Sequence, residues 1–376
     1  MGRKMKIGII TLSASYNCGS MLQSYALKEI LSEYGTTEII NFSSEASHRV
    51  YDILPTTFLG KIHMIVKCPK MFYELKNEKK AYEIFKRNIL GIDSKERFAS
   101  DLCEITDKYD VVVAGSDQIW NVCMGDFDEA FLCGWTNKRK IAYAPSLGGH
   151  DIRESSEAIK YINELKQFER LSAREEKGRN CLEEITGRTV PVVLDPTLVY
   201  EKANWCKLVG QPLVKGKYIF YYSWAYCEEE LRKIVSKRSE EMGIPVYVID
   251  ARKWREHRYS KDNFVLCKQA GPMAFLNLMF YAKECYVESF HGMIFAYIFK
   301  KKFWLLDTHE DYEKMDTRLR ELIEVLNVRE RVLTPYNKEN TDMEKNITYR
   351  NNEEIQKKIK LSRTYLDNSL KKENSK

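Results

Sequence analysis

Short apolar segments alternate with helical segments in both halves of this chain, and this alternation restricts the fold more than any other feature. In the second half we expect strands at 218–222, 246–249, 285–288 and 303–306, separated by helices at 228–242, 272–283 and 292–299. The first half begins in the same way, with strands at 6–10 and 111–114 and a helix at 20–34. Strands that alternate with helices form parallel sheets covered by those helices. The pattern therefore predicts an α/β fold.

Chain length and one polar stretch indicate two domains. A chain of 376 residues exceeds the roughly 100–200 residues of a typical domain. The stretch 200–217 is polar, contains Pro and Gly, and separates the two alternating halves, as a boundary does. We predict two domains with parallel sheets at 1–205 and 206–335, then a polar tail at 336–376 with one helix that docks on a domain. Two such domains facing each other would place their strand-end loops across a shared cleft.

Charge and cysteine usage exclude several classes of protein. The net charge of +6, from 60 Lys and Arg against 54 Asp and Glu, is too mild for a nucleic-acid-binding protein. An acidic small molecule or an anionic surface is the expected partner. The ten cysteines are scattered with no Cys-x-x-Cys, so we expect a reducing cytoplasm and no metal site. The basic N-terminus leads directly into the first strand, and no apolar run reaches the roughly 18 residues of a membrane span.

The segment 285–299, CYVESFHGMIFAYIF, carries the strongest candidate for a functional side chain. A buried strand runs into Ser289, His291 and Gly292, and an apolar helix follows. A His at a tight turn before a helix lies beside free backbone N–H groups, where an anionic ligand is favoured. The alternative is a half-buried structural His, so other loops must support the site.

The loop between the first strand and the first helix, TLSASYNCG, has the small and polar residues of a ligand-facing loop. It matches neither Gly-x-Gly-x-x-Gly nor a P-loop, so it is a weak signal for a nucleotide. Asn17, Gly19 and Gln23 are its candidate ligand-binding residues. The alternative for Gln23 is a solvated position on the helix.

Two later strands also end in polar, flexible loops. The apolar strand 111–114 ends in Gly-Ser-Asp-Gln, which contains the candidates Ser116, Asp117 and Gln118. Asp117 can orient a sugar hydroxyl or accept its proton, or it can cap the next helix. The strand 141–144 ends in a small-residue loop with Ser146. Farther on, Arg174 precedes a helix, where it can bind a carboxylate or phosphate or pair with a neighbouring Glu.

Residues 61–87 have mainly basic charges with interleaved apolar residues, which predicts one or two amphipathic helices. A solvated helix face is the first interpretation. The second is peripheral contact with an anionic membrane or with a lipid-linked acceptor.

With these features in place, the sequence resembles the polysaccharide pyruvyl transferase family over residues 5–335. The resemblance depends on segments in a fixed order: KIGIITLSASYNCGSMLQSYAL, VVAGSDQIWN, IAYAPSLG, SAREEKG, VLDPTLV, QAGPMAFLNLMFYA and ESFHGMIFAYIF. It implies two Rossmann-like domains in a GT-B-like arrangement with an inter-domain cleft, acting in the cytoplasm or on the inner face of the cell membrane. It also implies transfer of pyruvate, as a ketal, from phosphoenolpyruvate to a polysaccharide or lipid-linked sugar, with no metal and no separate cofactor.

The resemblance implies roles for individual residues. His291 aligns with the family's His and becomes the general acid and donor binder on the C-terminal domain. Arg174 aligns with an Arg suited to donor binding. Asp117, Ser116 and Asn17 would face the sugar or the donor, with the N-terminal domain as the acceptor side.

The chain departs from the family's pattern at one position, where a positive charge is missing. Well-characterised members have Arg two positions before the His, where this chain has Ser289. Ser289 can donate a hydrogen bond but supplies no positive charge, so Arg174, the lysines at 300–302 or Arg318 must compensate, or the donor differs. The alternative functions are a GT-B-like glycosyltransferase that uses a nucleotide sugar and a non-catalytic glycan-binding family member.

Overall fold

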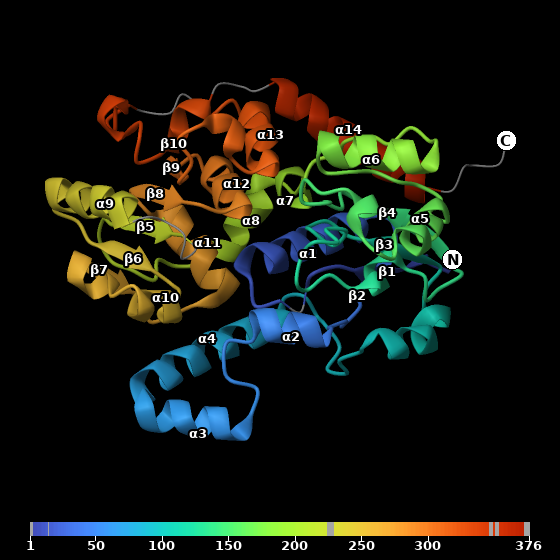
Figure 1. Cartoon of the computed structure of the whole chain (residues 1–376), viewed down its shortest axis with the longest axis horizontal. Helices are drawn as coiled ribbons and strands as arrows, with labels where there is room; N and C mark the ends of the chain where they lie inside the picture. The colour runs from blue at the N-terminus through green and yellow to red at the C-terminus, as the bar shows by residue number, and fades with distance from the viewer. Residues whose placement is uncertain (1–2, 14, 224–228, 346–348, 350–352, 372–376) are drawn as a thin grey trace. The chain divides into compact units, whose positions relative to one another are not determined.

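The chain divides into two compact units, each built on a parallel sheet. The computed structural model describes residues 3–13, 15–223, 229–345, 349 and 353–371 (Figure 1). Unit 1 comprises Met1–Asp52, Lys86–Tyr200 and Glu353–Lys376, and unit 2 comprises Ile53–Phe85 and Glu201–Asn352. The chain passes between units at Tyr200–Glu201, close to the expected boundary. Residues 53–85 belong with unit 2 and the tail helix with unit 1, so neither unit is a single continuous segment.

In the described residues, unit 1 has a four-stranded sheet in the order β2-β1-β3-β4, with every pair parallel. The strands are β1 (Lys6–Ile10), β2 (Thr36–Ile39), β3 (Val111–Ala114) and β4 (Arg139–Ala142). All four residues of β3 are buried because helices cover both faces of a parallel sheet. Beyond β4 the parallel pairing continues only as isolated bridges, Ile141↔Arg170 and Ala173↔Val192. The sequence of the apolar segment 190–194 also predicts a strand, and that prediction is wrong because a single residue of the segment, Val192, forms a bridge.

The helices of unit 1 connect these strands and close the unit with the end of the chain. They are α1 (Cys18–Leu31), α2 (Glu45–Tyr51), α5 (Ala158–Lys166), α6 (Glu176–Thr186), α7 (Pro196–Val199) and α14 (Glu353–Leu370). The tail helix α14 packs on this unit: the Tyr365 hydroxyl donates to the Ala142 carbonyl at 2.7 Å, and Leu366 is fully buried. The apolar residues of the tail therefore lie on one face of α14, and this face packs on the rest of unit 1.

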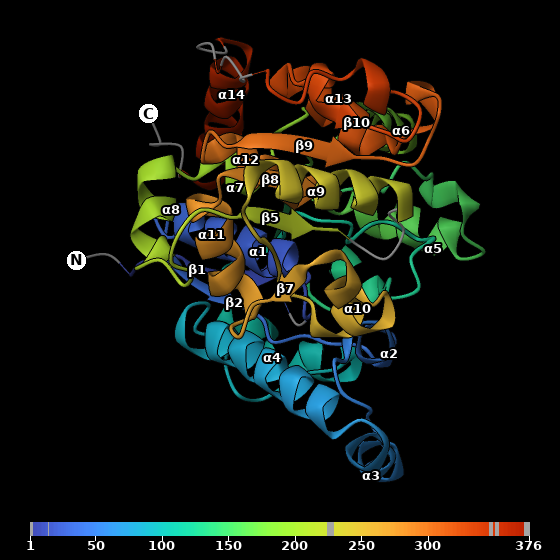
Figure 2. The ribbon, with the colours of Figure 1, turned by 90° about the vertical axis from the view of Figure 1, so that its left-hand side faces the viewer.

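Unit 2 has, in the part of the chain that the structure describes, a six-stranded sheet in the order β10-β9-β8-β5-β6-β7 (Figure 2). The strands are β5 (Ile219–Tyr222), β6 (Val246–Val248), β7 (Phe264–Leu266), β8 (Glu284–Val287), β9 (Lys302–Leu306) and β10 (Val332–Leu333). All pairs are parallel. Counted within the unit, the order is that of the dinucleotide-binding Rossmann sheet. The predicted α/β class with two parallel sheets is confirmed.

Aromatic side chains form the centre of unit 2 between sheet and helices. Trp205 and Phe295 contact edge to face with ring centroids 4.9 Å apart, and Phe275 packs on Phe295 at 5.6 Å. Such contacts add to the burial of large apolar surfaces. The helices are α3 (Phe58–Lys67), most of α4 (Pro69–Asn88), α8 (Lys202–Val209), α9 (Glu229–Met242), α10 (Ala251–Glu256), α11 (Gly271–Tyr281), α12 (Phe290–Ile298) and α13 (Thr317–Leu326).

Short 3₁₀ segments fill the connections in both units. They are η1 (Ala99–Lys108), η2 (Glu129–Leu132), η3 (Ile152–Glu154), η4 (Tyr259–Asp262), η5 (Tyr312–Lys314), η6 (Arg329–Arg331) and η7 (Lys338–Asn340).

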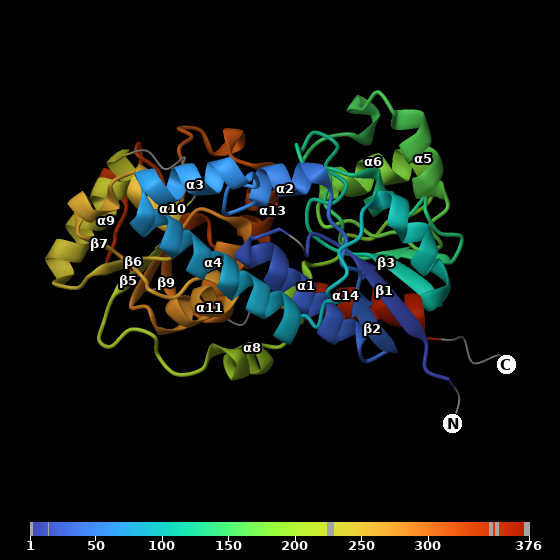
Figure 3. The same ribbon diagram turned by 90° about the horizontal axis from the view of Figure 1, so that it is seen from below.

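Helix α4 runs past α10 of the same unit (Figure 3), and polar contacts hold α4 and the segment before it to α10. Arg255 pairs with Glu74 at 2.6 Å, and Arg252 donates to the Ile53 carbonyl at 2.6 Å. Glu78 accepts from the backbone of Ala251, while its Oε2 has no hydrogen-bond partner among the described residues. Burial, followed by repulsion from Asp250, raises the pKa of Glu78 to about 8. Glu78 therefore holds its proton more tightly in the folded chain than in the unfolded chain.

We expect Glu78→Gln to stabilise the protein at alkaline pH and to leave it unchanged below about pH 4. The folded pKa lies above the unfolded value of about 4.3, so wild-type stability falls as pH rises between the two, by at most about 1.4 kcal/mol per pH unit. Gln imitates the protonated carboxyl and removes that loss. Thermal unfolding of both proteins across this range, with the exposed Glu310→Gln as control, measures the effect. Parallel curves for wild type and Glu78→Gln would contradict it.

Candidate functional site

Each sheet has a point at which its strand order reverses, and the predicted site residues gather there. In unit 1 the reversal lies between β1 and β3, and in unit 2 between β5 and β8. Adjacent loops leave the sheet in opposite directions at such a point, and the opening at the carboxyl ends of the strands is where parallel sheets bind ligands. Asn17 and Asp117 follow β1 and β3, while Ser289 and His291 follow β8.

Asp117 is held at the carboxyl end of β3 in an unusual backbone conformation. Its φ of 76° lies in the left-handed region, which is costly for a residue with a Cβ and is frequent at functional sites. Its Oδ2 accepts from the Ser20 hydroxyl at 2.7 Å, and its Oδ1 accepts from the Gln118 backbone at 2.9 Å. The side chain is almost buried. The carboxylate is therefore fixed in position by both loops of the switch point.

Arg174 lies buried among three carboxylates. Its Nε donates to Glu175 at 2.8 Å, and its Nη1 lies 3.2 Å from Asp195 and 3.8 Å from Asp117. Burial alone would lower the pKa of Arg174, but Glu175, Asp195 and Asp117 outweigh it and raise the pKa above its ordinary value. Ser116 also donates to Asp195, at 3.0 Å. The pairing with Glu175 that the sequence left open is present, and donor binding by Arg174 stays a prediction.

The other candidate residues near the loop after β1 make contacts that hold this loop in place. Asn17 caps α1 by accepting from the Ser20 backbone at 3.1 Å, and Gly19 is buried in the first turn. Gln23 is fully buried and donates to Thr11 at 2.8 Å, so the interpretation as a solvated helix residue is wrong. Thr11 in turn donates to the Ser116 carbonyl at 3.0 Å. This chain of hydrogen bonds ties the loop after β1 to the loop after β3.

Ser146 and Gln118 shape the neighbouring loop. The Ser146 backbone donates to the Asp117 carbonyl at 2.8 Å, and its hydroxyl accepts from Gly148 at 3.0 Å. Gln118 accepts from the Asn121 side chain at 2.9 Å. Ser146 is fully buried, so the structure gives it a role in loop geometry.

Sequence reasoning missed Asp126 and Tyr51, which folding brings to Asp117. Burial raises the pKa of Asp126, a hydrogen bond from Tyr51 opposes the rise, and the charge on Asp117 adds to it. Burial and then Asp126 raise the pKa of Tyr51. The Oδ2 of Asp126 has no hydrogen-bond partner among the described residues. Two carboxyl groups with differing environments can divide the roles of acid and base, and no local motif marks Asp126 or Tyr51 as members of a site.

His291 lies in the first turn of α12 and is 8% exposed. The helix begins at Phe290, two residues earlier than expected, because Ser289 is the N-cap and accepts from the Gly292 backbone at 3.0 Å. A Cβ on Gly292 would lie 3.0 Å from the Val287 Cβ, so a larger residue would push the helix from β8. The imidazole is thus at the helix N-terminus, as predicted, but is more buried than an open turn would leave it.

A hydrogen bond joins the two loops of the switch point in unit 2. The Ser223 hydroxyl, directly after β5, donates to Glu288 at 2.6 Å directly after β8. Glu288 precedes the N-cap of the His291 helix, so its carboxylate is placed at the same sheet edge. Sequence reasoning assigned Glu288 to the strand and did not identify it as a candidate.

The cations that could replace the family's Arg lie at different edges of the sheet in unit 2. Lys301 lies between α12 and β9, and Lys302 is the first residue of β9. Lys302 pairs with Glu284, the first residue of β8. Both lysines are at the amino edge, about 13 Å along the helix from Ser289. Arg318 begins α13 after β9 and pairs with Asp316 at 2.5 Å. The lysines at 300–302 thus lie far from Ser289, and compensation by Arg318 stays a prediction.

Among the residues that the structure describes, folding gathers one group that could hold a metal ion. Ligand atoms of Cys123, His150 and Glu154 lie within 4.8 Å of one another in unit 1. The Cys123 thiol lies 3.5 Å and the His150 Nδ1 3.3 Å from Glu154 Oε2. The backbone of Asp151, His150 and Cys123 lower the pKa of Glu154. The three residues are partly or fully exposed, and their sequence spacing matches no metal motif.

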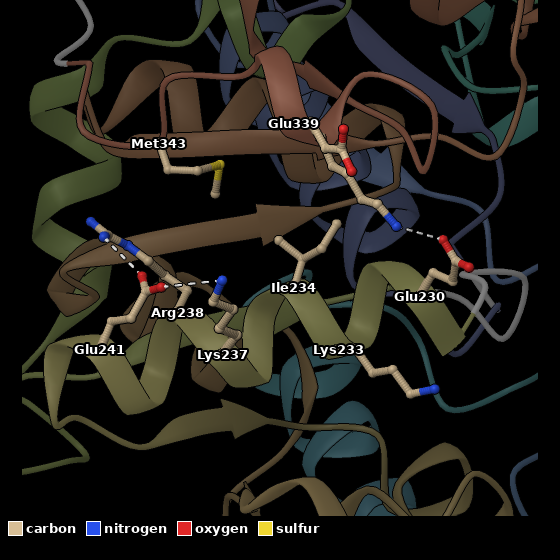
Figure 4. Close-up of a pocket in the computed structure, with 9 residues that line it drawn as sticks. Glu230, Lys233, Ile234, Lys237, Arg238, Glu241, Glu339 and Met343 are labelled. Carbon is tan, nitrogen blue, oxygen red and sulfur yellow. Dashed lines mark hydrogen bonds and ion pairs between the residues drawn. The ribbon is translucent and has the colours of Figure 1, made fainter.

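A surface pocket of about 500 Å³ in unit 2 holds none of the predicted residues (Figure 4). It lies between α9 and the segment around η7, with mixed charges: Lys338 pairs with Glu230, and Arg238 with Glu241. Its cations are already paired with its carboxylates to a large extent. The pocket therefore adds no member to the candidate site.

Solved structures with a similar fold share little sequence with this chain. A crystal structure of a UDP-N-acetylglucosamine 2-epimerase aligns with a TM-score of 0.50 and 12% identity, covering 100% of this chain and 99% of the epimerase. The UDP-GlcNAc 2-epimerase from Neisseria meningitidis bound to UDP-GlcNAc also gives a TM-score of 0.50, with 10% identity and coverage of 98% and 93%. These similarities support the GT-B-like fold class expected from the sequence.

Comparison by sequence identifies the family. No curated protein matches the chain. The family model described as polysaccharide pyruvyl transferase matches residues 17–310, which include Asp117, Arg174 and His291. The resemblance seen in the sequence motifs is confirmed, and the chain belongs to the polysaccharide pyruvyl transferase family.

Proposed function

We propose that this protein transfers pyruvate from phosphoenolpyruvate to two hydroxyls of a polysaccharide or lipid-linked sugar, forming a ketal, in the cytoplasm. The family match over 17–310 carries this proposal. It is supported by the placement of His291 in the first turn of α12 at the switch point of the second sheet. A helix N-terminus favours anions, and phosphoenolpyruvate has both a carboxylate and a phosphate.

The reaction adds a proton to carbon and exchanges phosphate for sugar oxygen. A general acid protonates the methylene carbon of phosphoenolpyruvate while one sugar hydroxyl adds to the neighbouring carbon. The bond between that carbon and the phosphate oxygen then breaks, and the second hydroxyl closes the ketal. Of the two hydroxyl protons, one replaces the proton given to carbon and the other leaves with phosphate. No oxidant or additional cofactor is needed for this balance.

The two units supply different parts of the proposed reaction. In unit 2, His291 is the general acid, and the N-terminus of α12 with Arg318 binds the anionic donor. In unit 1, Asp117 orients a sugar hydroxyl or accepts its proton. The Asp126 carboxyl, whose pKa is raised first by burial, hydrogen-bonds the acceptor sugar together with Tyr51. The acceptor sugar itself is identified only as a polyol with two neighbouring hydroxyls.

Incubation of the protein with phosphoenolpyruvate and candidate glycolipids tests the proposal. We expect phosphate release that depends on the acceptor, and an acceptor whose mass increases by one ketal-linked pyruvyl group. Turnover of a nucleotide sugar in place of phosphoenolpyruvate would indicate the glycosyltransferase alternative. Glycan binding without turnover of either donor would indicate a non-catalytic family member. Thermal stabilisation by phosphoenolpyruvate alone provides a separate measure of donor binding.

A further inference from the structure

Helix α3 presents its apolar stripe outward from unit 2. None of its residues is buried, and its largest apolar side chains are exposed: Phe58 75%, Leu59 77%, Ile62 42%, Ile65 42% and Val66 72%. These positions follow the spacing i, i+1, i+4, i+7 and i+8, so they share one face of the helix. A single exposed apolar residue is ordinary, but a continuous exposed stripe marks an interaction surface.

The opposite face of α3 is the one that contacts the protein. Gly60 and Met64 are partly buried on that face. A Cβ on Gly60 would lie 2.9 Å from the Pro55 Cβ and 2.8 Å from the Thr57 hydroxyl. Glycine therefore allows the backbone to lie close to the preceding segment. The helix is oriented by this contact, with its apolar stripe on the side away from it.

Helix α4 attaches the α3 surface to unit 2. Leu75, Tyr82 and Phe85 bury the inner face of α4, and Glu74 forms the ion pair with Arg255. Figures 1 and 2 show α3 farther than α4 from the sheet of the same unit. The exposed stripe on α3 is thus held to unit 2 through α4, which has its own core contacts.

The charges around the stripe have one sign. Between residues 56 and 80 every exposed charged side chain is a lysine: Lys61, Lys67, Lys70, Lys76 and Lys80. The two carboxylates of this segment, Glu74 and Glu78, are partly buried against α10. A second copy of the same surface would bring lysines against lysines, which opposes self-association. An anionic surface would instead attract these lysines.

We propose that α3 docks on a bilayer that contains anionic lipid. Phe58, Leu59 and Val66 enter the boundary between headgroups and acyl chains, and the flanking lysines contact the headgroups. Among the described residues, no helix is long and apolar enough to cross a membrane, so the contact is peripheral. Docking does not require the proposed chemistry, but it would bring the enzyme to a lipid-linked acceptor.

Flotation with vesicles of phosphatidylcholine, with and without phosphatidylglycerol, tests the proposal in the absence of glycan and donor. We expect binding only to the anionic vesicles, weakened by salt. Phe58→Ser/Leu59→Ser should weaken binding at least about tenfold, and Lys61→Gln/Lys67→Gln about fivefold per lysine. These side chains are exposed, so thermal unfolding should stay as in the wild type.

A matched double variant elsewhere serves as the control. Ile159→Ser/Leu361→Ser also removes two exposed apolar side chains, and it should bind vesicles as the wild type does. Equal vesicle binding by Phe58→Ser/Leu59→Ser and the wild type would overturn the proposal. So would a wild-type dimer that ignores vesicles and becomes a monomer in Phe58→Ser/Leu59→Ser, because the stripe would then bind a second copy.

Discussion

Replacing His291 with glutamine should lower phosphoenolpyruvate-dependent phosphate release by about 10²–10⁴-fold, the usual contribution of a general acid. Glutamine keeps hydrogen-bonding capacity and much of the side-chain volume but cannot transfer a proton to carbon. His291 sits in the first turn of α12 with Ser289 as the N-cap, so the backbone N–H groups that favour the donor remain. We therefore expect a large loss in kcat with a much smaller change in KM for phosphoenolpyruvate.

The measurement needs a control histidine in the same unit. His257 ends α10 and stacks on Tyr259 with ring centroids 5.6 Å apart, and His257→Gln should retain the wild-type rate. Thermal unfolding of His291→Gln separates loss of chemistry from loss of structure, since the imidazole is buried. A His291→Gln protein that is folded and fully active would remove His291 from the mechanism while leaving the family assignment intact.

The arrangement of the sheets could be predicted from the sequence because the strands are short, apolar and separated by helices. Strands β1 and β3 have the bounds expected, Lys6–Ile10 and Val111–Ala114. The strands β2, β7 and β10, of four, three and two residues, were missed because so few residues carry little periodicity. The segment 190–194 was misread since its apolar residues are buried without a continuous ladder.

The positions of the site residues were partly predictable for the same reason. Polar residues directly after apolar strands must lie at the carboxyl edge of a parallel sheet, and Asp117 and His291 follow β3 and β8 at that edge of their sheets. The partners of these residues were not predictable. Asp126 reaches the neighbourhood of Asp117 through a loop, and Asp195 pairs with Arg174 across 21 residues. Such contacts depend on tertiary structure and leave no local pattern.

The position of Ser289 explains how a family member can lack the expected Arg and keep the helix. Its hydroxyl caps α12 at 3.0 Å from the Gly292 backbone, and Ser is among the preferred N-cap residues. The helix N-terminus is therefore well formed without Arg at this position. The N-cap does not replace the positive charge of the missing Arg. We therefore expect donor binding to depend on Arg318.

Replacing Arg174 with glutamine should destabilise the protein by about 3–5 kcal/mol, the typical cost of removing one partner from a buried ion pair. Three carboxylates, on Glu175, Asp195 and Asp117, lie within 4 Å of its guanidinium. Without the cation they would repel one another in an environment with little water. The effect should appear as a lower midpoint in urea unfolding at neutral pH.

An exposed arginine on the following helix provides the control for Arg174. Arg179 pairs with Glu176 at 2.6 Å, and both side chains are more than a third exposed, so Arg179→Gln should change stability by less than about 1 kcal/mol. Equal midpoints for Arg174→Gln and the wild type would show that the three carboxylates do not need the cation for folding. If such a variant also failed to bind phosphoenolpyruvate, Arg174 would be a donor ligand. If Arg174→Gln instead unfolded at a lower urea concentration than the wild type and still bound phosphoenolpyruvate, the charge of Arg174 would stabilise the loops that hold Asp117 in place.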